Sequence, residues 1–286
     1  CGVIAVIGAP NAGKSTLVNA LVGAKVAIVS HKVQTTRARL MGVAMEGQTQ
    51  MVLVDTPGIF TPKRRLDRAM VHTAWGQIED ADQIILLVDA HRGLTHDVEL
   101  ILNGLKGKKQ PVILVLNKVD ALKDKSKLLK LATALHERHP FEETFMISAL
   151  DGAGVSDLRA YLTEKMPEGP WLFPEEQISD VTSRLMAAEI TREQVYLQLH
   201  DELPYAITVE TENWQGRKDG SVRIEQVIFV ERDTQKQIVI GKSGTRLKSI
   251  GATARLAMED LFGHRVHLFL FVKTDPRWSN SKERFQ

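Results

Sequence analysis

The sequence predicts two folded units: an α/β domain with a mostly parallel sheet, then a smaller α+β domain. Up to about residue 165, short β-branched runs alternate with helical segments, which is typical of a parallel sheet covered by helices on both faces. A proline- and glycine-rich run interrupts the chain there, and two expected strands then follow each other directly, as in α+β domains. The elements expected in the first unit are strands at Val3–Ile7, Met51–Asp55, Gln83–Asp89, Val112–Asn117 and Thr144–Ile147 and a helix at Lys14–Val22.

The interruption lies at residues 166–174, where nine positions hold three prolines and one glycine. Neither a helix nor a central strand tolerates that composition. We therefore expect a first domain over residues 1–168, a linker over 169–178 and a second domain over 179–286. The elements expected in the second domain are helices at Ser179–His200 and Thr245–Leu261 and strands at Tyr205–Thr211, Ser221–Glu231 and Val266–Lys273.

Composition indicates a globular protein of a reducing compartment. Of the 286 residues, 43% are apolar and 25% are charged, close to globular averages. The single cysteine, Cys1, excludes an internal disulfide framework, and the nine histidines show no metal-ligand spacing. No apolar run approaches the ~20 residues that span a bilayer, and the first residues are expected to form a strand and not a signal sequence. The formal charge of +2 predicts no partner, although Lys and Arg cluster in the C-terminal third.

A phosphate-binding loop is expected between the first strand and the first helix. Residues 8–15 have the spacing G-x-x-x-x-G-K-S in the strand-to-helix context that this pattern requires. Backbone N–H groups of such a loop and the N-terminus of the helix surround the phosphates. The lysine adds charge at the β- and γ-phosphates, and the serine hydroxyl binds Mg²⁺. The expected nucleotide contacts in this segment are Gly8, Asn11, Ala12, Gly13, Lys14, Ser15 and Thr16.

Two further segments end strands at the same edge of the expected sheet. Asp55 precedes a turn that closes at Gly58, and its carboxylate is a second Mg²⁺ contact, expected to act through water. The Asp120 carboxylate can accept hydrogen bonds from two neighbouring donors of guanine, whereas adenine would leave it unpaired. Asn117 would hold this segment to the phosphate loop, and the stem of Lys118 would cover the base plane. Support from the far side of the base is expected from Ser148, Ala149 and Leu150.

The second domain contains the glycine-rich stretch 240–251. Gly241-Lys242-Ser243 resembles the end of a phosphate loop, but position 236 is lysine where that pattern needs glycine. The stretch instead resembles the Gly-x-x-Gly turn of a type II K homology (KH) domain, which holds about four nucleotides of single-stranded RNA. Glycines permit close approach to phosphates, and the next helix begins there with exposed amides. The expected RNA contacts are Gly241, Lys242, Ser243, Gly244, Arg246 and Lys248.

Taken in order, these motifs resemble those of translation-factor-type P-loop GTPases, and in particular the Era family of bacterial ribosome-assembly GTPases. The resemblance is carried by Gln34-Thr35-Thr36-Arg37 ahead of Asp55-Thr56-Pro57-Gly58, with an RNA-binding module after them, and it covers nearly the whole chain. It implies a P-loop GTPase domain joined to a type II KH domain, hydrolysing GTP with Mg²⁺. By resemblance, Lys14, Thr36 and Gly58 serve catalysis, and the metal is held by Ser15, Thr36 and Asp55, with Thr35 as the alternative to Thr36.

Two positions bear on the rate of hydrolysis. Ile59 stands where Ras-type GTPases carry the glutamine that orients the attacking water, so intrinsic hydrolysis should be slow. Asn11 is a candidate ligand for K⁺, because relatives with asparagine at that loop position bind potassium beside the phosphates. Asparagine also suits a tight loop for structural reasons alone.

The expected partners are GTP and GDP, and the resemblance adds the 3′ end of 16S ribosomal RNA and the 30S subunit. A monomer in the cytoplasm is expected, with peripheral contact at the inner face of the cell membrane left open. The alternative is a nucleotide-gated signalling or membrane-surface GTPase whose second domain binds protein or lipid. Arg64, Arg65 and Arg68 suit anionic lipid as well as RNA.

Overall fold

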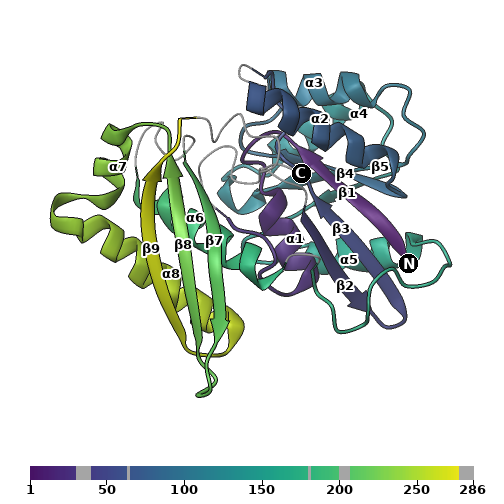
Figure 1. Ribbon diagram of the computed structural model, residues 1–286. Helices are drawn as coiled ribbons and strands as arrows, with labels where there is room; N and C mark the ends of the chain where they lie inside the picture. Colours follow the sequence, from purple (N-terminus) through teal and green to yellow (C-terminus); the bar gives the residue numbers. More distant parts are fainter. Residues whose placement is uncertain (30–39, 63–64, 180–181, 200–206, 277–286) are drawn as a thin grey trace. The chain divides into compact units, whose positions relative to one another are not determined.

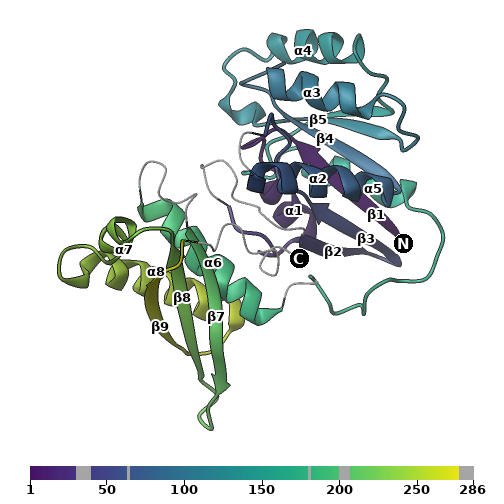
Figure 2. The same ribbon diagram turned by 45° about the horizontal axis from the view of Figure 1, so that its top comes forward.

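A computed structural model of the chain describes residues 1–29, 40–62, 65–179, 182–199 and 207–276. The chain divides into two compact units, Cys1–Asp180 and Val181–Gln286. Figures 1 and 2 show a mixed sheet with helices in the first unit and a three-stranded sheet with helices in the second. The α/β class of the first unit and the smaller α+β class of the second, both predicted from the sequence, are therefore confirmed.

The first unit is built on a six-stranded sheet of order β2-β3-β1-β4-β5-β6. β2 pairs antiparallel with β3, and the other neighbours are parallel. The order reverses at β1, between β3 and β4, which is where ligands bind in open α/β sheets. The strands are β1 (Gly2–Gly8), β2 (Leu40–Glu46), β3 (Thr49–Asp55), β4 (Gln83–Asp89), β5 (Val112–Asn117) and β6 (Glu143–Met146).

Helices cover both faces of this sheet. α1 and α5 pack on one face through Leu17, Leu21 and Leu158. α2, α3 and α4 pack on the other face, where Ile78 and Leu135 belong to the core. The central strands are buried along almost their whole length, so they read as continuous apolar runs and not as alternating ones. The helices are α1 (Lys14–Val22), α2 (Arg65–Glu79), α3 (His96–Leu105), α4 (Ser126–His136) and α5 (Val155–Lys165), with the short turn η1 (Val119–Ala121) after β5.

Residues 169–178 lie along the β2–β3 hairpin of the first unit. Trp171 Nε1 donates to the Gln48 carbonyl over 3.0 Å. The buried Gln50 side chain donates to the Phe173 carbonyl (2.8 Å) and accepts from the Leu172 and Phe173 amides. A proline-rich segment cannot satisfy its polar groups within a helix or sheet, and here a side-chain amide does so instead.

In the part of the second unit that the structure describes, three helices pack against one sheet of order β7-β8-β9. β7 and β8 are antiparallel, and β8 and β9 are parallel. Ile250, Ala254 and Met258 are buried along one stripe of α8, as the helical period of the sequence predicts. The elements are α6 (Ser183–Gln198), β7 (Ile207–Gly216), β8 (Val222–Val230), α7 (Asp233–Ile240), η3 (Lys242–Gly244), α8 (Thr245–Phe262) and β9 (Val266–Thr274).

β2 and α7 were not expected from the sequence, whereas α2, α3, α4 and α5 were expected only as helical segments without bounds. β2 is an edge strand that contains Gly42, a residue that weakens a strand pattern. Its exposed polar end leaves only a weak alternation of apolar and polar residues. α7 has only eight residues, of which Val239 alone is fully buried, so its apolar period is short. Its start is fixed by Gln235, whose side chain accepts from the Glu231 and Arg232 amides at 2.9 Å. Within the described residues, no helix is both long and apolar enough to cross a bilayer.

Candidate nucleotide and RNA sites

The loop between β1 and α1 wraps around the Lys14 side chain. Lys14 Nζ donates to the carbonyls of Gly8 and Ala9 at 3.1 Å each. Asn11 and Gly13 have φ values of 63° and 100°, and loops with such left-handed residues often form concave sites in which backbone N–H groups bind anions. α1 has no side-chain cap at Gly13 and no acidic residue in its first turn, so no side chain of its own competes for an anion there.

Burial perturbs the Lys14 ammonium. Only 7% of Lys14 is exposed, and burial lowers its pKa to about 8, while the charge of Asp55 acts in the opposite direction. A polyphosphate placed against Lys14 would favour the charged form and raise this pKa again.

Two oxygens next to the loop suit a magnesium ion. Ser15 Oγ donates to Asp55 Oδ2 over 2.6 Å, and Asp55 is fully buried at the end of β3. Mg²⁺ prefers oxygen ligands and is usually held by one or two protein groups together with phosphates and water. The residues present therefore fit the metal that the sequence predicts. Thr36 and its alternative Thr35 lie outside the described residues.

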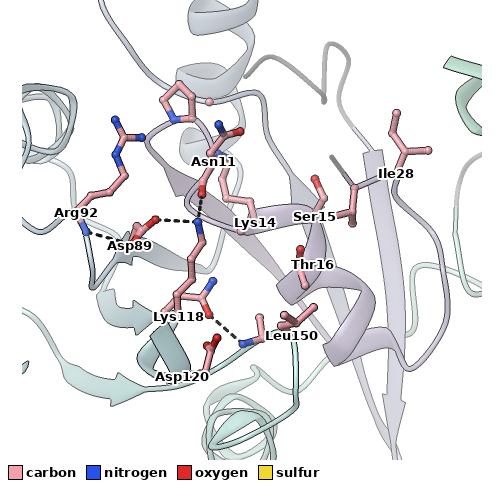
Figure 3. A pocket seen from close by; sticks show the side chains of 16 residues that line it. Asn11, Lys14, Ser15, Thr16, Ile28, Asp89, Arg92, Lys118, Asp120 and Leu150 are labelled. Carbon is pink, nitrogen blue, oxygen red and sulfur yellow. Dashed lines mark hydrogen bonds and ion pairs between the residues drawn. The ribbon is translucent and has the colours of Figure 1, made fainter. Parts of the chain in front are cut away.

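The end of β5 is joined to the phosphate loop by the buried Asn117 side chain. Asn117 Nδ2 donates to the Ala12 carbonyl (2.8 Å), and its Oδ1 accepts from the Ala149 amide (2.9 Å). Lys118 Nζ donates to the Asn11 carbonyl (2.6 Å) and forms an ion pair with Asp89 (2.8 Å). Asp120 is exposed at the rim (Figure 3), so a bound base would bury its carboxylate.

These groups line one cavity of about 450 Å³. It brings together eleven of the predicted residues: Asn11, Gly13, Lys14, Ser15, Thr16, Gly58, Asn117, Lys118, Asp120, Ala149 and Leu150. Four other predicted residues do not line the cavity but lie next to it. Gly8 and Ala12 supply the carbonyls already described, Asp55 contacts Ser15, and buried Ser148 accepts from the Asp151 amide at 3.4 Å.

Five residues that line the cavity were not predicted from the sequence: Pro10, Ile28, Val29, Asp89 and Arg92. Asp89 ends β4 and Arg92 follows in the next loop, at a strand end that the sheet order places beside the phosphate loop (Figure 3). A polar residue ending a buried apolar strand was the available signal for Asp89, because the same signal singled out Asp55 and Asn117. Ile28 and Val29 carry no comparable chemical signal.

The segment after β3 lies against the phosphate loop. A Cβ on Gly58 would lie 3.0 Å from Pro10 Cα, so glycine permits this close approach. Ile59 is fully buried in the core, and its amide donates to the Gly8 carbonyl over 3.1 Å. The Ile59 side chain therefore points away from the cavity and holds no water there. Ile59→Ala would remove core packing, so the variant would report on stability as much as on hydrolysis.

The second unit presents its own glycine loop before α8. Ser243 and Gly244 have φ values of 52° and 77°, and Gly244 is the N-terminal boundary of α8 without a side-chain cap. Lys242 and Lys248 are exposed, whereas the Arg246 guanidinium donates to the Ile238 carbonyl over 3.0 Å. A Cβ on Gly241 would lie 2.7 Å from Arg246 Cβ, so the loop packs tightly on its own helix at that glycine.

Comparison with known proteins identifies the family. Residues 3–118 match the family described as "50S ribosome-binding GTPase", and residues 202–279 match the KH domain family. "GTPase Era" of Rhizobium meliloti (strain 1021) is 60% identical over 285 residues, covering all of this chain and 91% of that protein. The chain belongs to the Era family of GTPases. As in any such GTPase, its reaction is the hydrolysis of GTP.

Other Era proteins agree with this assignment. "GTPase Era" of Brucella suis biovar 1 (strain 1330) is 59% identical and covers 100% of this chain and 91% of its own length. A crystal structure of Era with MgGDPNP and nucleotides 1506–1542 of 16S ribosomal RNA superimposes with a TM-score of 0.94, at 40% identity over 99% of this chain and 96% of that one. A variant of Aquifex aeolicus Era bound to GDP·AlF₄⁻ gives a TM-score of 0.93 at 40% identity, with the same coverage of both chains.

The lowered pKa of Lys14 predicts that GDP binding takes up protons. The free lysine, with a pKa near 8, loses its proton as the pH rises, and the phosphates restore it. Uptake should rise from about one tenth of a proton at pH 7 to about three quarters at pH 8.5. Calorimetric titration in buffers of different ionisation enthalpy measures it.

Lys14→Met should abolish this rise, and the exposed-surface variant Lys109→Met should preserve it. An uptake that stays flat between pH 7 and pH 8.5 in the parent protein would show that the buried ammonium keeps its proton without nucleotide.

Proposed function

We propose that the protein is a GTP-driven switch whose second unit binds single-stranded RNA, with the 3′ end of 16S ribosomal RNA as its target in 30S subunit assembly. The observation that carries this proposal is the Gly241–Gly244 loop at the start of α8, in a chain whose relative was crystallised with nucleotides 1506–1542 of that RNA. We place it in the cytoplasm as a monomer. Membrane contact has no supporting observation in the described residues.

In the nucleotide site, the loop amides and Lys14 hold the phosphates. Ser15 and Asp55 hold Mg²⁺, which neutralises the charge that develops on the phosphates, and Thr36 completes the metal site by family resemblance. Asp120 accepts from the two donors of guanine, and the stem of Lys118 and the exposed Leu150 cover the base. Support for these roles is that eleven of the assigned residues line one cavity.

The site lacks a side chain that could orient the attacking water at position 59, because Ile59 is buried in the core. Backbone groups of the switch segments, a partner or an ion must take that role. We propose K⁺ at Asn11, whose side chain lines the cavity beside the phosphate loop. The positive φ of Asn11 gives a separate, structural reason for asparagine, because this residue tolerates that conformation better than most.

If K⁺ binds at Asn11, replacing K⁺ by Na⁺ should slow GTP turnover by tenfold or more, equivalent to ~1.4 kcal/mol in the barrier. Asn11→Gly removes the amide but keeps the positive φ, so it should abolish the difference between the two ions. Asn103→Ala, on the exposed surface of α3, should retain the difference. Equal rates of the parent in K⁺ and Na⁺ would eliminate potassium from the account.

The RNA site is tested by Gly244→Asp, which places a negative charge where phosphate must lie. The position has open space and a φ of 77°, and aspartate tolerates this conformation, so the fold should survive. Affinity for short single-stranded RNA, measured by fluorescence anisotropy, should fall by a hundredfold or more, about 3 kcal/mol, while GTP affinity stays unchanged.

Gly263→Asp is the matched control, because Gly263 has a φ of 70°, the same open space and a place at the other end of α8. It should bind RNA like the parent. Normal RNA binding by folded Gly244→Asp would move the clamp elsewhere, and a partner-binding role for the second unit would then be favoured.

A further inference from the structure

Four exposed lysines follow Asp120 in the sequence. Lys123 and Lys125 lie between η1 and α4, only a few residues after Asp120. Lys127 and Lys130 lie on α4, where residues three apart are neighbours on the helix surface. We call these four residues the lysine surface.

Three other basic positions of the first unit have carboxylate partners, whereas the lysine surface has none in a salt bridge within the described residues. Lys108, Lys165 and Arg159 form salt bridges of 3.0, 2.7 and 2.7 Å with Glu79, Glu142 and Glu46. None of the four lysines forms a salt bridge within the part of the chain that the structure describes. Their positive charge is therefore not paired in a salt bridge.

Asp124 is the carboxylate within this segment. It accepts from the Ser126 amide over 3.0 Å, and hydrogen bonds from Ser126 lower its pKa, with a smaller contribution from Lys127. Four lysines against one aspartate leave a net charge of +3 over residues 121–130. Exposed charge of one sign at this density attracts polyanions.

The loop after β4 also carries a positive charge, which lies at the cavity. Gly93 lies against Leu131 of α4, since a Cβ on this glycine would lie 3.8 Å from Leu131 Cδ1. Figures 1 and 2 both show α3, which follows this loop, beside α4. Arg92, in the same loop, lines the cavity and is exposed. Arg92 at the cavity and the lysine surface at the start of α4 thus lie on neighbouring segments.

We propose that the lysine surface binds phosphates of RNA, as a second contact for a strand longer than the segment held by the loop of the second unit. This inference rests on the proposed RNA-binding function. A KH-type clamp covers about four nucleotides, so a longer RNA offers further phosphates to another basic surface. An unpaired cluster of strongly hydrated, flexible ammonium groups suits phosphate contacts without base selection.

The test variant is the triple Lys123→Gln, Lys125→Gln, Lys127→Gln in the full chain, and its control is Lys106→Gln, Lys108→Gln, Lys109→Gln. Both remove three positive charges from the first unit, and none of the six side chains lines the cavity. Two oligonucleotides are compared, one of about six nucleotides and one of about forty that contains the same segment. GDP affinity and circular dichroism establish that both variants are folded.

The test triple should bind the long RNA about ten- to a hundredfold more weakly than the control at 0.1 M salt, and flatten the salt slope by up to about two units. Binding of the short RNA should match the control. Equal binding of the long RNA by the two triples would overturn the inference, as would an equal loss on the short RNA. So would a selective loss of binding to phosphatidylserine vesicles with RNA binding intact.

Failure of the proposed function has a different signature. In that case the parent does not bind the short RNA, or Gly244→Asp binds it normally, whatever the lysine variants do.

Discussion

The Asn117 side chain donates to the Ala12 carbonyl and accepts from the Ala149 amide, so one buried amide joins the phosphate loop, the end of β5 and the loop after β6. The Asn117 side chain also leaves no room for a side chain at position 13, because a Cβ on Gly13 would lie 2.4 Å from Asn117 Nδ2. Removing the amide would leave buried groups unpaired at about 1–3 kcal/mol each. The position of Asp120 relative to the phosphates depends on this connection.

In both units, the helix that follows the glycine loop begins in the same way. α1 and α8 each begin at a glycine with positive φ, Gly13 and Gly244, without a side-chain cap and without acidic residues in the first turn. Such helix ends leave amide donors and a partial positive charge for an anion. The first loop closes around a buried lysine, whereas the second keeps Lys242 and Lys248 exposed. That difference suits an enclosed nucleotide in one unit and a passing RNA strand in the other.

The sequence predicted many of the residues that line the cavity, where local pattern and strand order coincide. The loop pattern placed the start of α1 at Lys14, and Asn117 was expected to hold the phosphate loop, as its contact with Ala12 now shows. Asp89 and Arg92 were missed because their place beside the loop follows from the order of β1, β4 and β5, which no local pattern contains. The short helix α7 was missed because eight residues give too little apolar period.

The identity of the base is the central claim, and Asp120→Asn tests it most directly. An amide at this position can donate to the carbonyl that xanthine carries where guanine has its amine. The variant side chain therefore pairs with xanthine, whereas the parental carboxylate pairs with guanine. Affinities for GDP and xanthosine diphosphate should reverse their order, with GDP weakened about ten- to a hundredfold. Asp124→Asn, an exposed carboxylate four residues on, should keep the parental preference. An unchanged preference for GDP in folded Asp120→Asn would contradict the account.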